Sequence, residues 1–115
     1  MTNPQRGELQ VELGDQVLDA RVTLDTIVRI ETSLSMSILK CAQLLSTGEL
    51  TIEQLQVILL RSLRSGGNKL ENKDIQKLMW DAGLANCYRV AGEILAMTLG
   101  TDEDDQGNEV AAEKA

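Results

Sequence analysis

Two short runs near the start of the chain alternate polar and apolar residues. The apolar members are Leu9, Val11 and Leu13 in residues 8–13, and Leu18, Ala20 and Val22 in residues 16–22. A period of two is typical of half-buried strands. Gly14-Asp15 lies between the runs and suits a type II′ turn, because glycine takes positive φ at the first central position. The pattern predicts an N-terminal β-hairpin.

From residue 23 the apolar spacing changes to the period of amphipathic helices. Thr23 is suited to cap a first helix. A serine-rich break over residues 32–37 separates it from a second helix, and Gly48 ends that one. The residues expected to face the core are Leu24, Ile27, Val28 and Ile30 in the first helix, and Leu34, Ile38, Cys41, Ala42 and Leu45 in the second.

The segment Thr51-Ile-Glu-Gln54 has the pattern of a capping box and predicts the start of a third helix. Leu50 and Leu55 have the spacing of a hydrophobic staple around this cap. Residues 57–60 are apolar on every side of the helix, so the segment is either central to the fold or part of an interface. The helix ends at Ser65-Gly66-Gly67.

Two more helices follow, separated by Gly83. We expect Asn72 to cap the fourth. The expected inward residues are Ile75, Leu78, Met79 and Ala82 in the fourth helix, and Leu84, Cys87, Tyr88, Ala91, Ile94, Leu95 and Thr98 in the fifth. The predicted fold class is therefore α+β and mostly helical: an N-terminal β-hairpin followed by about five short helices in a compact bundle. Residues 1–100 form a single domain in this interpretation.

Composition changes the picture at the C-terminus. Residues 100–115 carry six acids against Lys114, whereas residues 1–99 carry twelve acids against ten bases. Residues 101–115 have almost no large apolar side chain, so we expect a disordered acidic tail. The nearly neutral remainder argues against nucleic acid as a partner. No apolar run approaches the roughly 18 residues that span a bilayer, so we expect no membrane association and a cytoplasmic location.

The residue types needed for most catalysis are missing. The chain has no histidine, and histidine is the commonest general base and metal ligand. No nucleotide-binding or hydrolase motif occurs. The acids at residues 102–105 lack the spacing of a calcium loop, and we interpret Cys41 and Cys87 as reduced structural residues. We expect no cofactor, no metal and no enzymatic activity, unless scattered carboxylates assemble a site.

Two features are candidates for binding a partner protein. The one basic cluster comprises Arg61, Arg64, Lys69, Lys73 and Lys77. It could dock an acidic partner or the chain's own tail, but complementation of helix dipoles and solubility is the favoured interpretation. Met79 and Trp80 are the second candidate, since tryptophan dominates interface energetics when exposed. With so few aromatic residues in the chain, core filling is the favoured interpretation of Trp80.

The order of the elements resembles a known family. Arg6-Gly7-Glu8 opens the hairpin, and the segments that carry the resemblance are VTLDTIVRIE at 22–31, LLSTGELTIEQLQVILLRSLRSGG at 44–67 and DAGLANCYRVAGEILAMTLG at 81–100. Over about residues 6–100 the chain is similar to the small tail proteins of gene transfer agents and prophages, described as tail assembly chaperone-like or as tail tube proteins. Asn86-Cys87 and the acidic tail depart from the family's pattern.

The resemblance implies a non-catalytic protein-binding role in assembling a phage-like tail. One hypothesis is a tail assembly chaperone that binds the tape measure protein in the host cytoplasm and helps the tail tube protein polymerise. The alternative is a structural tail tube subunit that stays in the particle, although one hairpin supplies few strands for a β-rich ring. A small enzyme is the third possibility.

Overall fold

The structure is a computed structural model that describes residue 3 and residues 6–100. Its elements are β1 (Glu8–Leu13), β2 (Gln16–Arg21), α1 (Leu24–Leu34), α2 (Ile38–Thr47), α3 (Ile52–Ser65), α4 (Asn72–Ala82) and α5 (Leu84–Thr98). The predicted fold class, a hairpin followed by five helices, is confirmed. The predicted acidic tail at 101–115 lies outside the described residues, and the domain boundary at residue 100 stays a prediction.

The hairpin has the predicted turn and register. β1 and β2 pair antiparallel from Glu8 opposite Arg21 to Leu13 opposite Gln16, which leaves a two-residue loop. Gly14 has φ +66° at the first position of that loop, the conformation that glycine adopts without steric cost. The alternating apolar side chains face the helices, and the most deeply buried are Val11, Leu13 and Ala20.

Helix α1 begins where the sequence predicted, but only part of its predicted apolar stripe faces the core: Ile30 is buried and Ile27 packs against the core. The Thr23 hydroxyl accepts a hydrogen bond from the Thr26 amide at 3.2 Å, which confirms the predicted cap. Thr26 and Ile30 are the buried residues of α1. Leu24 is 78% exposed and Val28 is 50% exposed, so their predicted core positions are wrong. Periodicity locates an apolar stripe, but the neighbouring helices decide which edge of it they cover.

Helix α3 is the centre of the fold. Its capping box is confirmed, because the Thr51 amide donates to Gln54 Oε1 at 2.9 Å and the Gln54 amide donates to Thr51 Oγ1 at 3.2 Å. It contacts α1, α4, α5 and β2, so apolar residues are buried on several of its sides. These are Leu55, Ile58, Leu59, Leu60 and Leu63. The central position, one of the two predicted alternatives, is therefore confirmed.

Helix α4 starts from a different cap than expected. Glu71 occupies the cap position, and its amide donates to Asp74 Oδ2 at 2.8 Å. Asn72 is the first helical residue instead, and its side-chain oxygen accepts from Gln56 Nε2 of α3 at 3.4 Å. The prediction failed because Asn72 resembles a cap locally, while its amide group is used in a tertiary contact.

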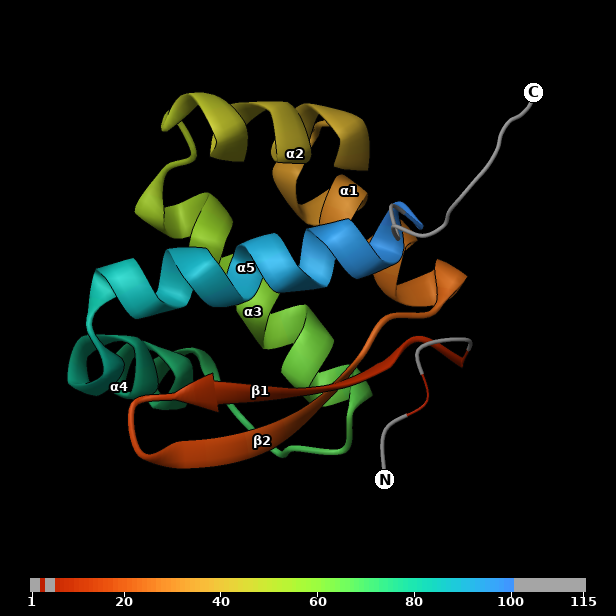
Figure 1. The fold of residues 1–115 in the computed structure, drawn as a ribbon. Coiled ribbons are helices and arrows are strands. Elements are labelled where there is room, and N and C mark those ends of the chain that lie inside the picture. Colours follow the sequence, from red (N-terminus) through yellow and green to blue (C-terminus); the bar gives the residue numbers. More distant parts are fainter. Residues whose placement is uncertain (1–2, 4–5, 101–115) are drawn as a thin grey trace.

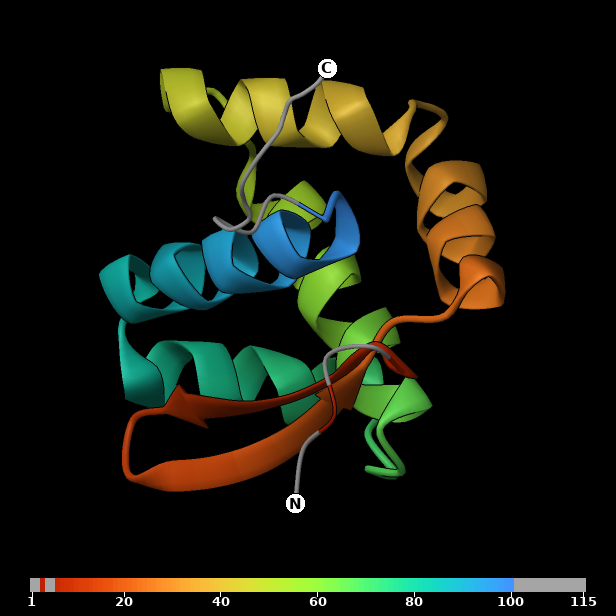
Figure 2. The ribbon, with the colours of Figure 1, turned by 45° about the vertical axis from the view of Figure 1, so that its right-hand side comes forward.

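The elements stack around α3 and α5. In both ribbon views α1 and α2 lie on one side, α4 and the hairpin lie on the other, and α3 and α5 run between them (Figures 1 and 2). The α4–α5 turn and the hairpin turn lie at the same end of the molecule (Figure 1). Within the described residues, no helix combines the length and apolar character required to traverse a membrane.

Candidate functional site

The predicted basic cluster is not one surface. Arg61 and Arg64 line a groove between α1 and α3, whereas Lys69 and Lys77 line a separate depression between β2 and α4. Lys73 is exposed in the first turn of α4. Residues that are close in sequence are separated because the chain reverses between α3 and α4. The predicted cluster is therefore divided, and the depression that holds Lys69 and Lys77 is also lined by Asp74 and Asp81, which balance its charge.

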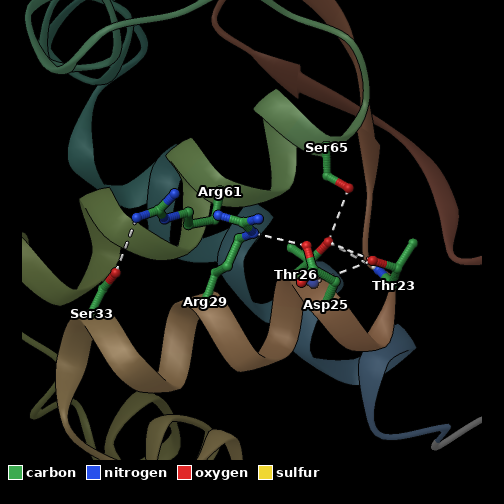
Figure 3. A network of polar contacts seen from close by, with 7 residues as sticks. All are labelled: Thr23, Asp25, Thr26, Arg29, Ser33, Arg61 and Ser65. Atoms are coloured by element: carbon green, nitrogen blue, oxygen red, sulfur yellow. Dashed lines mark hydrogen bonds and ion pairs between the residues drawn. The ribbon is translucent and has the colours of Figure 1, made fainter.

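The groove between α1 and α3 also contains an arginine that the sequence did not single out. We call this surface the arginine groove, and its residues are Asp25, Thr26, Arg29, Arg61, Arg64 and Ser65. Figure 3 shows that the side chains reach into it from both helices. Arg29 was missed because it is 32 positions from Arg61 in the sequence, and only the packing of α1 on α3 makes them neighbours.

Each guanidinium of the arginine groove is positioned by one hydrogen bond. Arg29 Nε donates to Asp25 Oδ2 at 2.8 Å, and this bond raises the pKa of Arg29. Arg61 Nη2 donates to Ser33 Oγ at 3.3 Å, and Arg64 Nε donates to the Leu70 carbonyl at 2.7 Å. A guanidinium has five donors, so most donors in the groove have no protein acceptor within residues 6–100.

The second predicted pair, Met79 and Trp80, is divided between core and surface. Met79 is 3% exposed and packs in the core, so its side chain is not available to a partner. Trp80 is 81% exposed, and the favoured interpretation of Trp80 as a core residue is wrong. Successive residues of a helix point about 100° apart, and here the boundary of the core falls between them.

Trp80 lies near the α4–α5 turn, where side-chain hydrogen bonds connect α5 to the hairpin. Leu84, the first residue of α5, was expected in the core but is 41% exposed. We call Trp80 and Leu84 the apolar corner. Two residues further, the Asn86 side chain accepts from the Gly14 amide at 2.8 Å and donates to the Glu12 carbonyl at 3.1 Å. Asn86, noted only as a departure in the sequence, ties the hairpin turn to α5.

Both cysteines are buried and free, as predicted. Burial raises the pKa of Cys41 and of Cys87 above the ordinary value of 9.0, and the nearby Glu31 carboxylate adds to the effect at Cys41. Such thiols stay protonated and unreactive near neutral pH. Within the part of the chain that the structure describes, no three His, Cys, Asp or Glu residues are grouped so that they could hold a metal ion.

Comparison with known proteins identifies the family. Residues 6–101 match the family described as phage tail tube protein, GTA-gp10. The chain belongs to this family. The resemblance stated from the sequence is thereby confirmed over the predicted length. No curated protein matches the chain, and no solved structure matches it either.

Membership gives the chain a role connected with phage tails. The arginine groove and the apolar corner are two candidate binding surfaces among the described residues. One concentrates positive charge, and the other exposes the only tryptophan of the chain. Both are assembled from segments inside the matched range.

Proposed function

We propose that this protein is a non-catalytic tail assembly chaperone, acting in the host-cell cytoplasm, that binds the tape measure protein through its apolar corner. The family supports a role among other tail proteins. The absence of histidine from the whole sequence supports a role without catalysis. In this proposal the protein keeps the long helical tape measure protein available while tail tube subunits assemble around it.

The exposed side chain of Trp80 is the observation that carries the proposal. An indole left in water forgoes about 1.5–3 kcal/mol or more of burial free energy. Tryptophan is enriched among the few residues that dominate binding energy in protein interfaces. Leu84, four positions later at the start of α5, is a second exposed apolar side chain near the α4–α5 turn. Such a pair suits the apolar stripe of an amphipathic helix, the form in which helices dock onto protein surfaces.

The sheet supports a chaperone rather than a tube subunit. Among the described residues it consists of β1 and β2 alone, and the rest of residues 6–100 is mainly helical. One hairpin supplies two strands, fewer than the roughly 4–6 of a typical sheet, so it offers little sheet to a ring built by pairing strands between subunits. The family description includes the words tail tube protein, so a tube subunit is the alternative that an experiment has to separate.

Co-expression with the tape measure protein tests the proposal. A tagged form of this protein should recover the tape measure protein in a soluble complex. Replacing the indole by Trp80→Ala should weaken binding at least about 30-fold, corresponding to the roughly 2 kcal/mol of an interface hot spot. Leu24→Ala is the matched control, because Leu24 is an equally exposed apolar residue on α1, away from the apolar corner.

Two results would contradict the proposal. Equal weakening by Leu24→Ala would mean that the apolar corner is not the binding surface. Recovery of this protein as a major, stoichiometric component of purified particles would identify a tube subunit. Quantitative mass spectrometry of particles, compared with the lysate from which they were purified, distinguishes the two roles.

A further inference from the structure

The arginine groove holds more positive charge than its surroundings neutralise. Arg29, Arg61 and Arg64 contribute three positive charges and Asp25 contributes one negative charge, so the net charge is +2. Lys77 and Arg89, on α4 and α5, each form an ion pair with one acid four positions away, Asp81 and Glu93. The groove departs from that one-to-one pairing.

The polar floor of the groove is also suited to an anionic ligand. Thr26 is buried, and its hydroxyl donates to Ser65 Oγ at 2.9 Å, which joins α1 to α3 to one side of Arg29 and Arg61 (Figure 3). This bond joins the two helices from which the three arginine side chains extend. Guanidinium groups held in a fixed arrangement bind carboxylates through charge-assisted and often bidentate hydrogen bonds.

We propose that the arginine groove binds the acidic segment 101–115 of this same chain. Six acids and Lys114 give residues 100–115 a net charge of −5, and four of the acids are consecutive at 102–105. Opposite charge on a segment that directly follows the fold makes it the first anion available to the groove. This inference is independent of the proposed function, since it concerns another surface and another ligand.

The segment starts close enough to reach the groove. The C-terminal end of α5 lies on the same side of the molecule as α1 in both ribbon views (Figures 1 and 2). An extended chain spans at most about 3.3–3.6 Å per residue, so the acids at 102–105 reach up to about 18 Å from Gly100, and Glu109 and Glu113 reach up to about 32 Å and 47 Å.

Tethering makes a weak interaction sufficient. A single exposed ion pair is weak, but a ligand on a short linker has an effective concentration in the millimolar range. Several such pairs populate the docked form at low ionic strength. Because the Debye length is about 8 Å at physiological ionic strength and about 3 Å at 1 M salt, added salt should release the segment. In the docked form, the segment covers the arginines and prevents other anions from binding to them.

NMR spectroscopy of the full-length protein tests this contact. The variant with Asp102→Asn, Glu103→Gln, Asp104→Asn and Asp105→Asn removes four charges from the segment. At about 20 mM salt, where screening is weak, the Nε–Hε signals of Arg29 and Arg61 should differ between wild type and this variant. At about 500 mM salt the two spectra should converge, because screening releases the wild-type segment.

Two charge variants of the folded part provide the matched comparison. Arg29→Gln with Arg61→Gln removes two charges from the groove, whereas Lys69→Gln with Lys73→Gln removes two charges elsewhere. The groove variant should shift the amide signals of residues 102–105, and the lysine variant should leave them in place. Circular dichroism of each variant confirms that the fold is retained.

A peptide of residues 101–115, added to the charge-neutralised full-length protein, completes the test. It should shift the same arginine signals, and the groove variant should weaken its binding at least about tenfold. Identical arginine signals in wild type and tail variant at low salt would overturn the proposal. So would an equal response of residues 102–105 to the lysine variant, which would show unspecific attraction. Peptide binding without an effect of the attached segment would assign the groove to another protein's acidic segment.

Discussion

Helix α3 and the apolar corner are both rich in apolar residues, yet one is enclosed and the other is open to solvent. Five residues of α3 are buried against neighbours on several sides, whereas Trp80 and Leu84 project from the α4–α5 turn. The difference lies in the number of elements that surround each segment. The apolar residues of α3 therefore stabilise the fold, whereas those of the apolar corner remain available for binding.

The largest expected effect tests whether α3 is as enclosed as its packing indicates. Leu59→Ala should lower the free energy of unfolding by about 2–5 kcal/mol, because it removes a fully buried side chain and leaves a cavity. Urea denaturation followed by circular dichroism measures it. Leu39→Ala on α2 is the control, since Leu39 is exposed and should change stability by less than about 0.5 kcal/mol. If both variants lost the same free energy of unfolding, α3 would not be more enclosed than the exposed face of α2.

Substitutions at the adjacent residues Met79 and Trp80 separate a contribution to stability from a contribution to binding. Met79→Ala should cost about 2–3 kcal/mol because Met79 is packed in the core. Trp80→Ala should change the free energy of unfolding by less than about 0.5 kcal/mol, since its indole is exposed. Thermal and urea denaturation of both variants provide the comparison. A large loss for Trp80→Ala would mean that the corner contributes to folding.

Two glycines, one at the end of α3 and one within α5, test the packing with effects of opposite sign. A methyl group at Gly66, where α3 ends, would lie 2.2 Å from the Asp19 carbonyl oxygen of β2. Gly66→Ala should therefore cost about 1–3 kcal/mol through overpacking. At Gly92 in α5 the nearest atom, Leu45 Cδ2, would be 3.6 Å away. Gly92→Ala should stabilise the protein by about 0.5–1 kcal/mol, as alanine favours the helix. The same sign for both variants would contradict this packing.

The smallest effect concerns pH. Burial raises the folded-state pKa of Cys41 and Cys87. The contribution of these thiols to stability is thus fully present below their ordinary pKa of 9.0 and is lost as pH rises through the higher folded values, because the unfolded chain releases the protons first. Under reducing conditions, urea midpoints should fall above pH 9. The double variant Cys41→Ala and Cys87→Ala should show a smaller fall, and an unchanged slope would argue against burial of the thiols.

Local chemistry explains why much of the fold was predictable. The Gly14 turn, the Thr23 cap and the Thr51–Gln54 capping box each depend on a few neighbouring residues. Packing explains the failures. Nothing in the local sequence distinguishes Leu24, which is exposed, from Ile30, which is buried, because the neighbours that cover α1 come from distant segments.

The candidate surfaces were less predictable than the fold, for the same reason. Arg61 and Arg64 were identified from their charge, but Arg29 joined them only when α1 packed on α3. Lys69 was separated from them by the reversal of the chain after α3. Asn86 was noted as unusual, and its bonds to the hairpin turn depend on a partner more than 70 residues away.

By itself, the sequence determined the element order, most helix ends and the family, because these follow from local hydrogen bonding and periodicity. Tertiary structure alone decided which apolar residues are enclosed and which charges share a surface. Burial depends on how many elements surround a side chain, and that number is set only when distant segments pack. Met79 and Trp80 are adjacent in the sequence, and only packing around α4 placed one in the core and the other in solvent.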